Sequence, residues 1–202
     1  SIYFQYCKFL ILKKYKLVIT LEKEFFKPDY CDLYNLYKII INRKPKTVVE
    51  IGSGYSTLVM AKALEINKKK YNIQPKLYSL EQDIHYKNLI EEYLKKNLCY
   101  ESNLFIEIIK TELDIIDFKG EKVSICKYLP SETINFIYED RTDHEIYTIA
   151  GDAIFIESKM PPDFCICVDG MKPTVDFYKR NLMRNYNCSG GFFHGYTFIP
   201  SD

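Results

Sequence analysis

From residue 47 onward, short apolar runs alternate with longer segments of helical periodicity, and this alternation is the strongest constraint on the fold. The first run, Thr47 to Ile51, precedes a helix expected from about Ser56 to Ile66. The order then repeats, with strands expected at residues 76–80, 104–109, 134–138 and 164–168 and helices at 83–97, 146–158 and 174–186. Strands that alternate with helices form a parallel sheet covered on both faces. The sequence therefore predicts a three-layer α/β sandwich.

Three stretches fall outside this alternation. Residues 1–45 form a helical and basic segment, which we expect to pack on a domain of residues 46–202. Helical spacing runs from Tyr30 to Ile40, and Pro45 lies just beyond the end of this helix. Residues 111–128 lack helical spacing, and Phe118 to Glu121 has the composition of a β-hairpin turn. Residues 192–199 read as a final strand or hairpin.

Composition narrows the class of partner. The formal net charge is +1, so there is no basic excess to indicate a nucleic-acid partner. The most apolar early stretch, residues 9–12, is far shorter than the ~20 residues of a transmembrane helix. Seven cysteines lack paired zinc-type spacing, and Cys165 and Cys167 are expected to be buried thiols rather than metal ligands. Free thiols predict a cytoplasmic protein.

Ligands of such sheets bind beyond the carboxyl ends of the strands, so the turn after the first strand is the most informative stretch. Gly52 and Gly54 allow the backbone to approach a ligand closely, and the following helix start favours a carboxylate or phosphate. A dinucleotide fingerprint would have a third glycine where this chain has Thr57. The turn therefore suits an amino-acid carboxylate, and the acidic Glu50 ending the strand suits an ammonium group.

The stretch from Glu50 to Thr57 resembles motif I of the class I S-adenosylmethionine-dependent methyltransferases. The resemblance continues at Glu81, which ends the second strand where that family places the acid that binds the ribose hydroxyls. Tyr138-Glu139-Asp140 and Val168-Asp169-Gly170 end the fourth and fifth strands. This layout is similar to bacterial methyltransferases of surface-polysaccharide pathways and, more distantly, to O-methyltransferases of the catechol type.

The resemblance implies a Rossmann-like, mostly parallel sheet of order 3-2-1-4-5-7-6. Only about fifteen residues follow the last expected helix, so the final strands would be short or incomplete. It also implies a cofactor site for S-adenosylmethionine. The residues that it assigns to this site are Glu50, Gly52, Ser53, Gly54 and Ser56 around the methionine part, Glu81 at the ribose, Thr111 at the adenine edge, and Asp140 at the amino group or acceptor.

For catalysis, the residues expected beside the transferred methyl group are Asp140, His144 and Asp169. A general base needs a pKa near the working pH, which a histidine has without perturbation and a buried aspartate can reach. A second interpretation is that Asp143 and His144 only cap the next helix. Catechol-type relatives hold Mg²⁺ with acids at the positions of Asp140 and Asp169, but Gly170 replaces an asparagine ligand, which favours a metal-free mechanism. Tyr55 and Tyr138 are expected to line the pocket.

The sequence thus predicts a methyltransferase that acts on a sugar or other small hydroxylated acceptor. One alternative is an NAD(P)-dependent oxidoreductase, which the missing third glycine and the lack of a Tyr-x-x-x-Lys pair after the fourth strand disfavour. Another is a cofactor-binding module without turnover. The acceptor and the oligomeric state, a homo-oligomer included, stay open because a fold does not specify them.

Overall fold

A seven-stranded sheet forms the centre of the computed structural model, which describes residues 2–10, 13, 29–97, 103–141, 149–191 and 195–201. The sheet order is β3-β2-β1-β6-β8-β10-β9. These strands are β3 (Phe105–Lys110), β2 (Lys76–Glu81), β1 (Thr47–Ile51), β6 (Phe136–Glu139), β8 (Cys165–Val168), β10 (Gly195–Pro200) and β9 (Tyr186–Gly191). Pairing is parallel from β3 to β8, and β10 runs antiparallel to both its neighbours. The predicted Rossmann-like sheet, with order 3-2-1-4-5-7-6, is confirmed.

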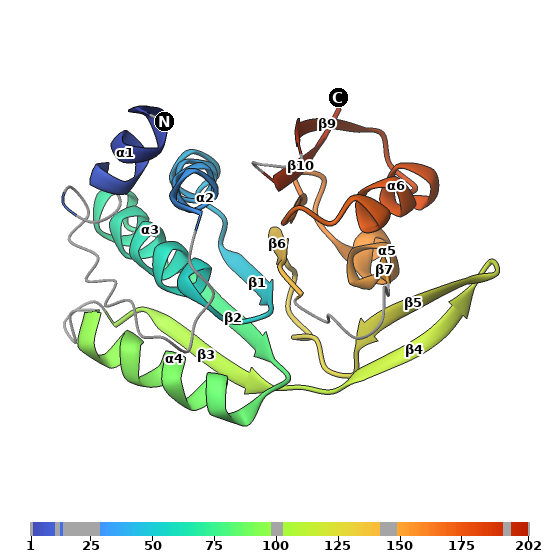
Figure 1. Ribbon diagram of the computed structural model, residues 1–202, viewed down its shortest axis with the longest axis horizontal. Helices are drawn as coiled ribbons and strands as arrows, with labels where there is room; N and C mark the ends of the chain where they lie inside the picture. Colours follow the sequence, from blue (N-terminus) through green and yellow to red (C-terminus); the bar gives the residue numbers. More distant parts are fainter. Residues whose placement is uncertain are drawn as a thin grey trace.

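Two layers cover the sheet, one on each face (Figure 1). One layer contains α1 (Ile2–Phe9), α2 (Tyr30–Arg43), α3 (Tyr55–Tyr71) and α4 (Ile84–Asn97). The other contains α5 (Asp152–Ile156), a 3-10 helix (Glu157–Lys159), α6 (Lys172–Asn181) and a small sheet of β4 (Leu113–Phe118), β5 (Glu121–Cys126) and β7 (Ile149–Ala150). Strand side chains alternate between the layers, so Val48 packs under the first and Val49 under the second.

The hairpin of β4 and β5 confirms the turn predicted from residues 118–121. Lys119 and Gly120 both have positive φ, 56° and 84°, and the Gly120 N–H donates to Asp117 Oδ1 over 2.9 Å. Such a turn matches the twist of paired strands. Phe118 packs edge-on against Phe155 and Phe177, with ring centroids 5.6 Å apart in both cases. The hairpin thus covers part of one face of the main sheet.

Two predicted helix boundaries are wrong. The helix expected to reach residue 186 ends at Asn181, because Glu157 accepts from the backbone N–H groups of Met183 and Arg184 and holds the chain in a turn. Strand β9 begins at Tyr186, and the last two strands have six residues each instead of being very short. The helix expected over 146–158 begins later in its described part: Ile149 pairs with Val123 in β7, and helical residues run from Asp152 through α5 and the 3-10 helix to Lys159.

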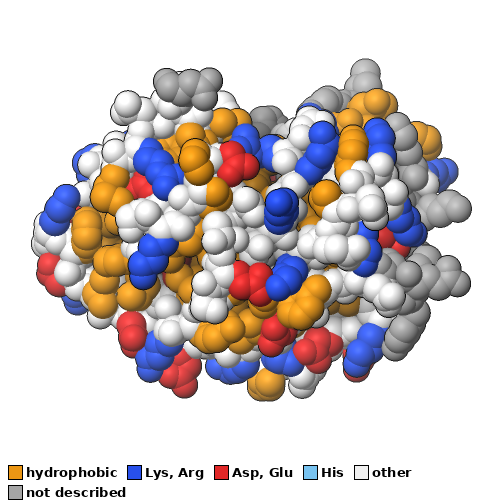
Figure 2. Space-filling model, turned by 180° about the vertical axis from the view of Figure 1, so that it is seen from behind, with side chains coloured by type: hydrophobic (Ala, Val, Ile, Leu, Met, Phe, Trp, Pro, Cys, Tyr) orange, Lys and Arg blue, Asp and Glu red, His pale blue; other side chains and the backbone are white. Residues whose placement is uncertain are grey.

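Helix α1 packs on α2 and α2 packs on α3, and their buried side chains belong to the same core as those of α3 and α4. The Asn67 side chain of α3 donates to the Ile40 carbonyl at 2.8 Å, joining α3 to α2. The division of the chain at residue 45 stays a prediction. In the part of the chain that the structure describes, no helix is long and apolar enough to cross a bilayer. Figure 2 shows basic side chains scattered among acidic ones over one face.

Candidate active site

The turn after β1 meets the end of β6 closely, and Gly52 makes this contact possible. Gly52 has φ of 93°, and a Cβ added there would lie 1.9 Å from the backbone carbonyl oxygen of Asp140. The Gly52 N–H donates to the Leu80 carbonyl, and the Asp140 N–H donates to the Ile51 carbonyl, each at 2.9 Å. Any side chain at position 52 would therefore push apart the ends of two neighbouring strands.

Beneath this turn, Glu50 is fully buried and organises the start of α3. Its carboxylate accepts from the hydroxyls of Ser56 at 2.5 Å, Thr57 at 2.6 Å and Ser79 at 2.6 Å. Thr57 Oγ1 in turn accepts from the Gly54 N–H at 3.0 Å. Burial raises the pKa of Glu50 to about 7, against the opposing effect of these hydrogen bonds. Glu50 and Ser56 therefore position the turn, and their direct contact with a cofactor stays a prediction.

Glu81 stands beside the turn at the end of β2, only 9% exposed. Its Oε2 accepts from the Ser53 N–H at 2.8 Å and its Oε1 from the Asp83 N–H at 2.9 Å. Each oxygen keeps a further lone pair, so a fixed carboxylate can still accept from two neighbouring hydroxyls of a ligand. Thr111 follows β3, is buried, and donates its N–H to the Glu81 carbonyl at 2.8 Å. The structure thus brings Glu81, Ser53 and Thr111 together at one edge.

Asp140 and Asp169 follow the neighbouring strands β6 and β8, and their side chains hydrogen-bond to each other. Burial raises the pKa of both carboxyls, and for Asp140 the nearby Asp169 and Glu50 add to the rise. The pair therefore retains a proton at a pH where a free aspartate has none. Asp143 and His144 lie outside the described residues, so the predictions for them stay predictions.

Mg²⁺ is commonly held by one or two carboxylates together with water and substrate oxygens, so Asp140 and Asp169 can supply two ligands. Among the residues that the structure describes, no three histidine, cysteine or acidic side chains form a candidate metal site. Mg²⁺ binding at Asp140 and Asp169 therefore stays a prediction.

Behind the pair, the chain after Asp140 is anchored by a buried ion pair. Arg141 forms a salt bridge with Asp152 and donates to Ser124 Oγ at 2.5 Å. Asp152 Oδ1 also accepts from the Cys126 N–H at 2.8 Å, which connects the end of β6 to α5 and to the hairpin. Breaking such a pair leaves an uncompensated buried charge, so Arg141 stays in place. Because Asp140 is the preceding residue, the anchored Arg141 also limits where Asp140 can lie.

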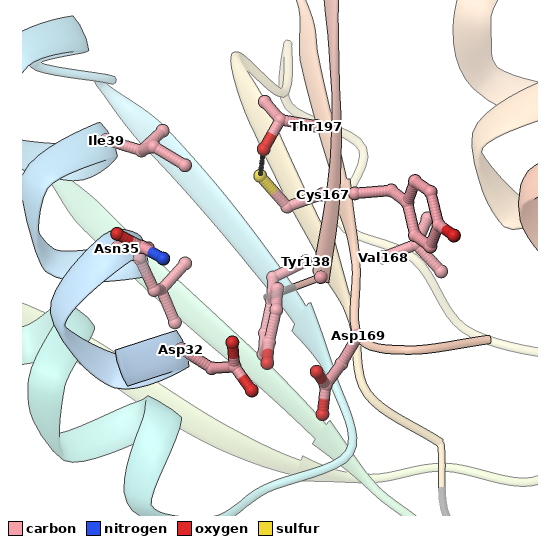
Figure 3. A pocket seen from close by; sticks show the side chains of 11 residues that line it. Asp32, Asn35, Ile39, Tyr138, Cys167, Val168, Asp169 and Thr197 are labelled. Atoms are coloured by element: carbon pink, nitrogen blue, oxygen red, sulfur yellow. Dashed lines mark hydrogen bonds between the residues drawn. The ribbon is translucent and has the colours of Figure 1, made fainter. Parts of the chain in front are cut away.

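A pocket opens next to the pair, between α2 and the ends of β6, β8 and β10 (Figure 3). Its polar lining comes from Asp32, Asn35, Tyr138, Asp169 and Thr197. Of the two tyrosines predicted to line the pocket, Tyr138 does so and Tyr55 does not, and Asp169 is a predicted catalytic residue. The sequence interpretation missed the α2 residues, whose i, i+3 spacing indicates one helix face but not what that face meets. It also missed the residues of β10, because the sequence predicts a strand there but does not show that it lies beside β8.

Neither a family model nor a curated protein matches this chain. Solved structures do match over nearly its whole length. A Podospora anserina methyltransferase with S-adenosylhomocysteine bound has a TM-score of 0.62 at 14% identity, over 98% of this chain and 93% of that one. A putative caffeoyl-CoA O-methyltransferase of Staphylococcus aureus has 0.60 at 14% identity, over 100% of both chains. A Bacillus cereus O-methyltransferase in complex with S-adenosylhomocysteine has 0.56 at 15%, over 100% and 98%. The chain therefore has the fold of S-adenosylmethionine-dependent methyltransferases.

Proposed function

We propose that this protein binds S-adenosylmethionine at the edge formed by Gly52, Glu81 and Asp140 and transfers its methyl group to a small hydroxylated molecule. The observation that carries the proposal is the carboxylate of Glu81, held by two backbone N–H groups beside a turn in which only glycine fits. That arrangement suits a ribose diol next to an amino-acid tail. The neighbours crystallised with this cofactor or its product have the same fold.

The roles of the side chains follow from their positions. Glu81 accepts from the ribose hydroxyls, and Thr111 lies where an adenine edge would pass. The turn from Gly52 to Gly54 and the start of α3 hold the methionine carboxylate, while Glu50 keeps that turn in place from below. The bound cofactor supplies an electrophilic methyl group on a sulfonium.

Asp140 and Asp169 supply the proton chemistry. A neutral hydroxyl is a weak nucleophile, and its proton has to leave as the methyl group arrives. The carboxyl pair lies at the ends of β6 and β8, adjacent to the turn after β1, and burial raises the pKa of both carboxyls. In its ionised form, Asp169 faces the pocket and can accept the acceptor's proton on a carboxylate oxygen.

The oxidoreductase alternative requires a glycine at position 57 for close approach of a pyrophosphate. Thr57 is fully buried there and donates to Glu50, so its side chain is part of the structure that shapes the turn. A sugar acceptor is supported by the small polar pocket with Asn35 and Tyr138 in its lining and by the sequence resemblance to polysaccharide-pathway enzymes.

The test is calorimetry of the whole chain with S-adenosylhomocysteine, for which we expect micromolar affinity, about −8 kcal/mol. NAD serves as the competing ligand. Transfer of a radiolabelled methyl group to a panel of sugars and phenols then distinguishes an enzyme from a binding module. Folded protein that binds NAD but not S-adenosylhomocysteine would contradict the proposal.

A further inference from the structure

The pocket under α2 is connected to the cofactor edge by two contacts. Asp169 lines the pocket and hydrogen-bonds to Asp140, and the Asp140 carbonyl lies against Gly52. A molecule in the pocket would therefore lie across the carboxyl pair from the turn that holds the cofactor. Under the proposed function, this is where the acceptor binds.

The charge of this pocket is one-sided. Figure 3 shows the carboxyl groups of Asp32 and Asp169 on either side of the Tyr138 hydroxyl. Asp140 lies next to Asp169 and is not part of the lining. Among the described residues that line the pocket, none is lysine or arginine. The basic Arg43, at the far end of α2, donates to the Asp163 carbonyl at 2.6 Å.

The titration of the lining groups agrees with this geometry. Burial raises the pKa of Asp32 to about 7, and the carboxylates of Asp29 and Asp169 add to the rise. Burial and then the surrounding carboxylates, Asp140 and Asp169 foremost, hold the pKa of Tyr138 well above its ordinary value. The carboxyl groups of Asp32 and Asp169 thus face one pocket, and a ligand that brings positive charge would favour their ionised forms.

Tyr138 gives a second sign of a ligand. Its side chain is 7% exposed, and its hydroxyl points into the pocket between the two carboxyls. Burial and neighbouring carboxylates account for its raised pKa, and no hydrogen bond is among the causes. A hydroxyl in this position can donate to a ligand oxygen or accept from a ligand N–H.

We propose that the pocket binds the methyl acceptor and selects one that carries a protonated amine beside its hydroxyl groups, over matched neutral or anionic acceptors. The inference rests on the proposed function for the presence of a cofactor site. Asp32 and Asp169 would bind the ammonium group, and Tyr138 and Asn35 the neighbouring hydroxyls.

The test uses three sugars that differ mainly in charge: glucosamine, glucose and glucuronate. Binding of each to the whole chain, saturated with S-adenosylhomocysteine, is measured by calorimetry at low and at high salt. We expect glucosamine to bind at least about tenfold more tightly than glucose, glucuronate to bind more weakly than glucose, and the differences to shrink as salt screens the charges.

Asp32→Asn should reduce the preference for glucosamine at least about fivefold, and Asn35→Asp should increase it. The matched control is Asp176→Asn, which removes an exposed carboxyl on α6 that pairs with Lys172, and it should leave the preference unchanged. Melting curves show that each variant is folded.

The two proposals fail separately. If S-adenosylhomocysteine binds but glucosamine and glucose bind equally, or no sugar of the series binds, the amine preference is overturned and the proposed function stands. The amine preference is also overturned if Asp32→Asn and Asp176→Asn behave alike. If S-adenosylhomocysteine itself does not bind to the folded chain, both proposals are overturned.

Discussion

Replacing Glu81 by glutamine is the sharpest test of the cofactor site, because it changes one oxygen and keeps the side chain's size. In the wild-type chain both carboxylate oxygens are held by backbone N–H groups, of Ser53 and Asp83. An amide can accept through one oxygen only, and its NH₂ group would point at a backbone N–H. The ribose diol would therefore lose one of two charged acceptors.

The expected loss is that of a hydrogen bond to a charged group, about 1.5–3 kcal/mol. In dissociation constant this is about 10- to 150-fold for S-adenosylhomocysteine. Part of the loss comes from the turn itself, since the Ser53 N–H bond also weakens. A double-mutant cycle separates the two effects by pairing the Glu81 variant with a ligand that lacks the 2′-hydroxyl.

Calorimetry on the four combinations gives the coupling between Glu81 and the 2′-hydroxyl, expected at about 1 kcal/mol or more. Glu107→Gln, an exposed acid on the adjacent strand β3, is the matched control and should bind both ligands as the wild type does. The reasoning is refuted if wild-type protein binds both ligands equally, or if Glu81→Gln weakens both by the same factor. Glu81 would then only hold the turn.

Gly52→Ala should cost at least about 2 kcal/mol of folding stability in urea titrations, since it adds strain at positive φ to the overlap with Asp140, and binding of S-adenosylhomocysteine should vanish. Turnover should be unchanged in a chelator, and restoration of lost activity by Mg²⁺ would instead show that Asp140 and Asp169 bind the ion. Asp140→Asn should lower kcat by about 10²- to 10⁴-fold. If His144→Gln lowers kcat by this factor and Asp140→Asn does not, the histidine is the base. Glu50 binds its proton more tightly in the folded chain, with a pKa of about 7 against 4.5. Its contribution to the free energy of unfolding therefore falls by up to about 3 kcal/mol as pH rises from 4.5 through 7. Glu50→Gln should remove this pH-dependent change, measured by denaturation at several pH values.

Much of the fold was predictable because the information is local. The apolar run of β1, the glycines after it and the helical spacing of α3 lie within about 25 residues, and they determine the first strand–turn–helix unit. The hairpin was predictable for the same reason, since Lys119 and Gly120 alone provide the two positive φ values. Sheet order then followed from the resemblance of the strand ends to a known family.

The errors come from contacts between distant parts of the chain. The end of α6 depends on Glu157, which accepts from N–H groups 26 and 27 residues further on, and no pattern near Asn181 shows this. The role of Glu50 was incomplete for a related reason. The Ser79 hydroxyl that it accepts from belongs to β2, and its burial depends on the whole sheet. Asp32 reads as an ordinary polar position until α2 is docked beside Asp169.

Asp140 and Asp169 connect the two halves of the proposed site, and their electrostatics suggest how binding on one side prepares the other. As the pair stands, burial of both carboxyls favours a retained proton, and the nearby Asp169 adds to this effect at Asp140. Positive charge at the turn beside Gly52, from a sulfonium and an ammonium group, would lower the pKa of the pair and favour its ionised form. Positive charge in the pocket beside Asp32 would act in the same direction.

The pair would therefore become a competent base only when both ligands are in place. It would regain its preference for a proton once methyl transfer has removed the charge on the sulfur. Acceptor binding and proton removal would then depend on the same two carboxyl groups. This dependence gives a reason for acidic side chains to lie together at a half-buried edge, where none of the described lining residues is lysine or arginine.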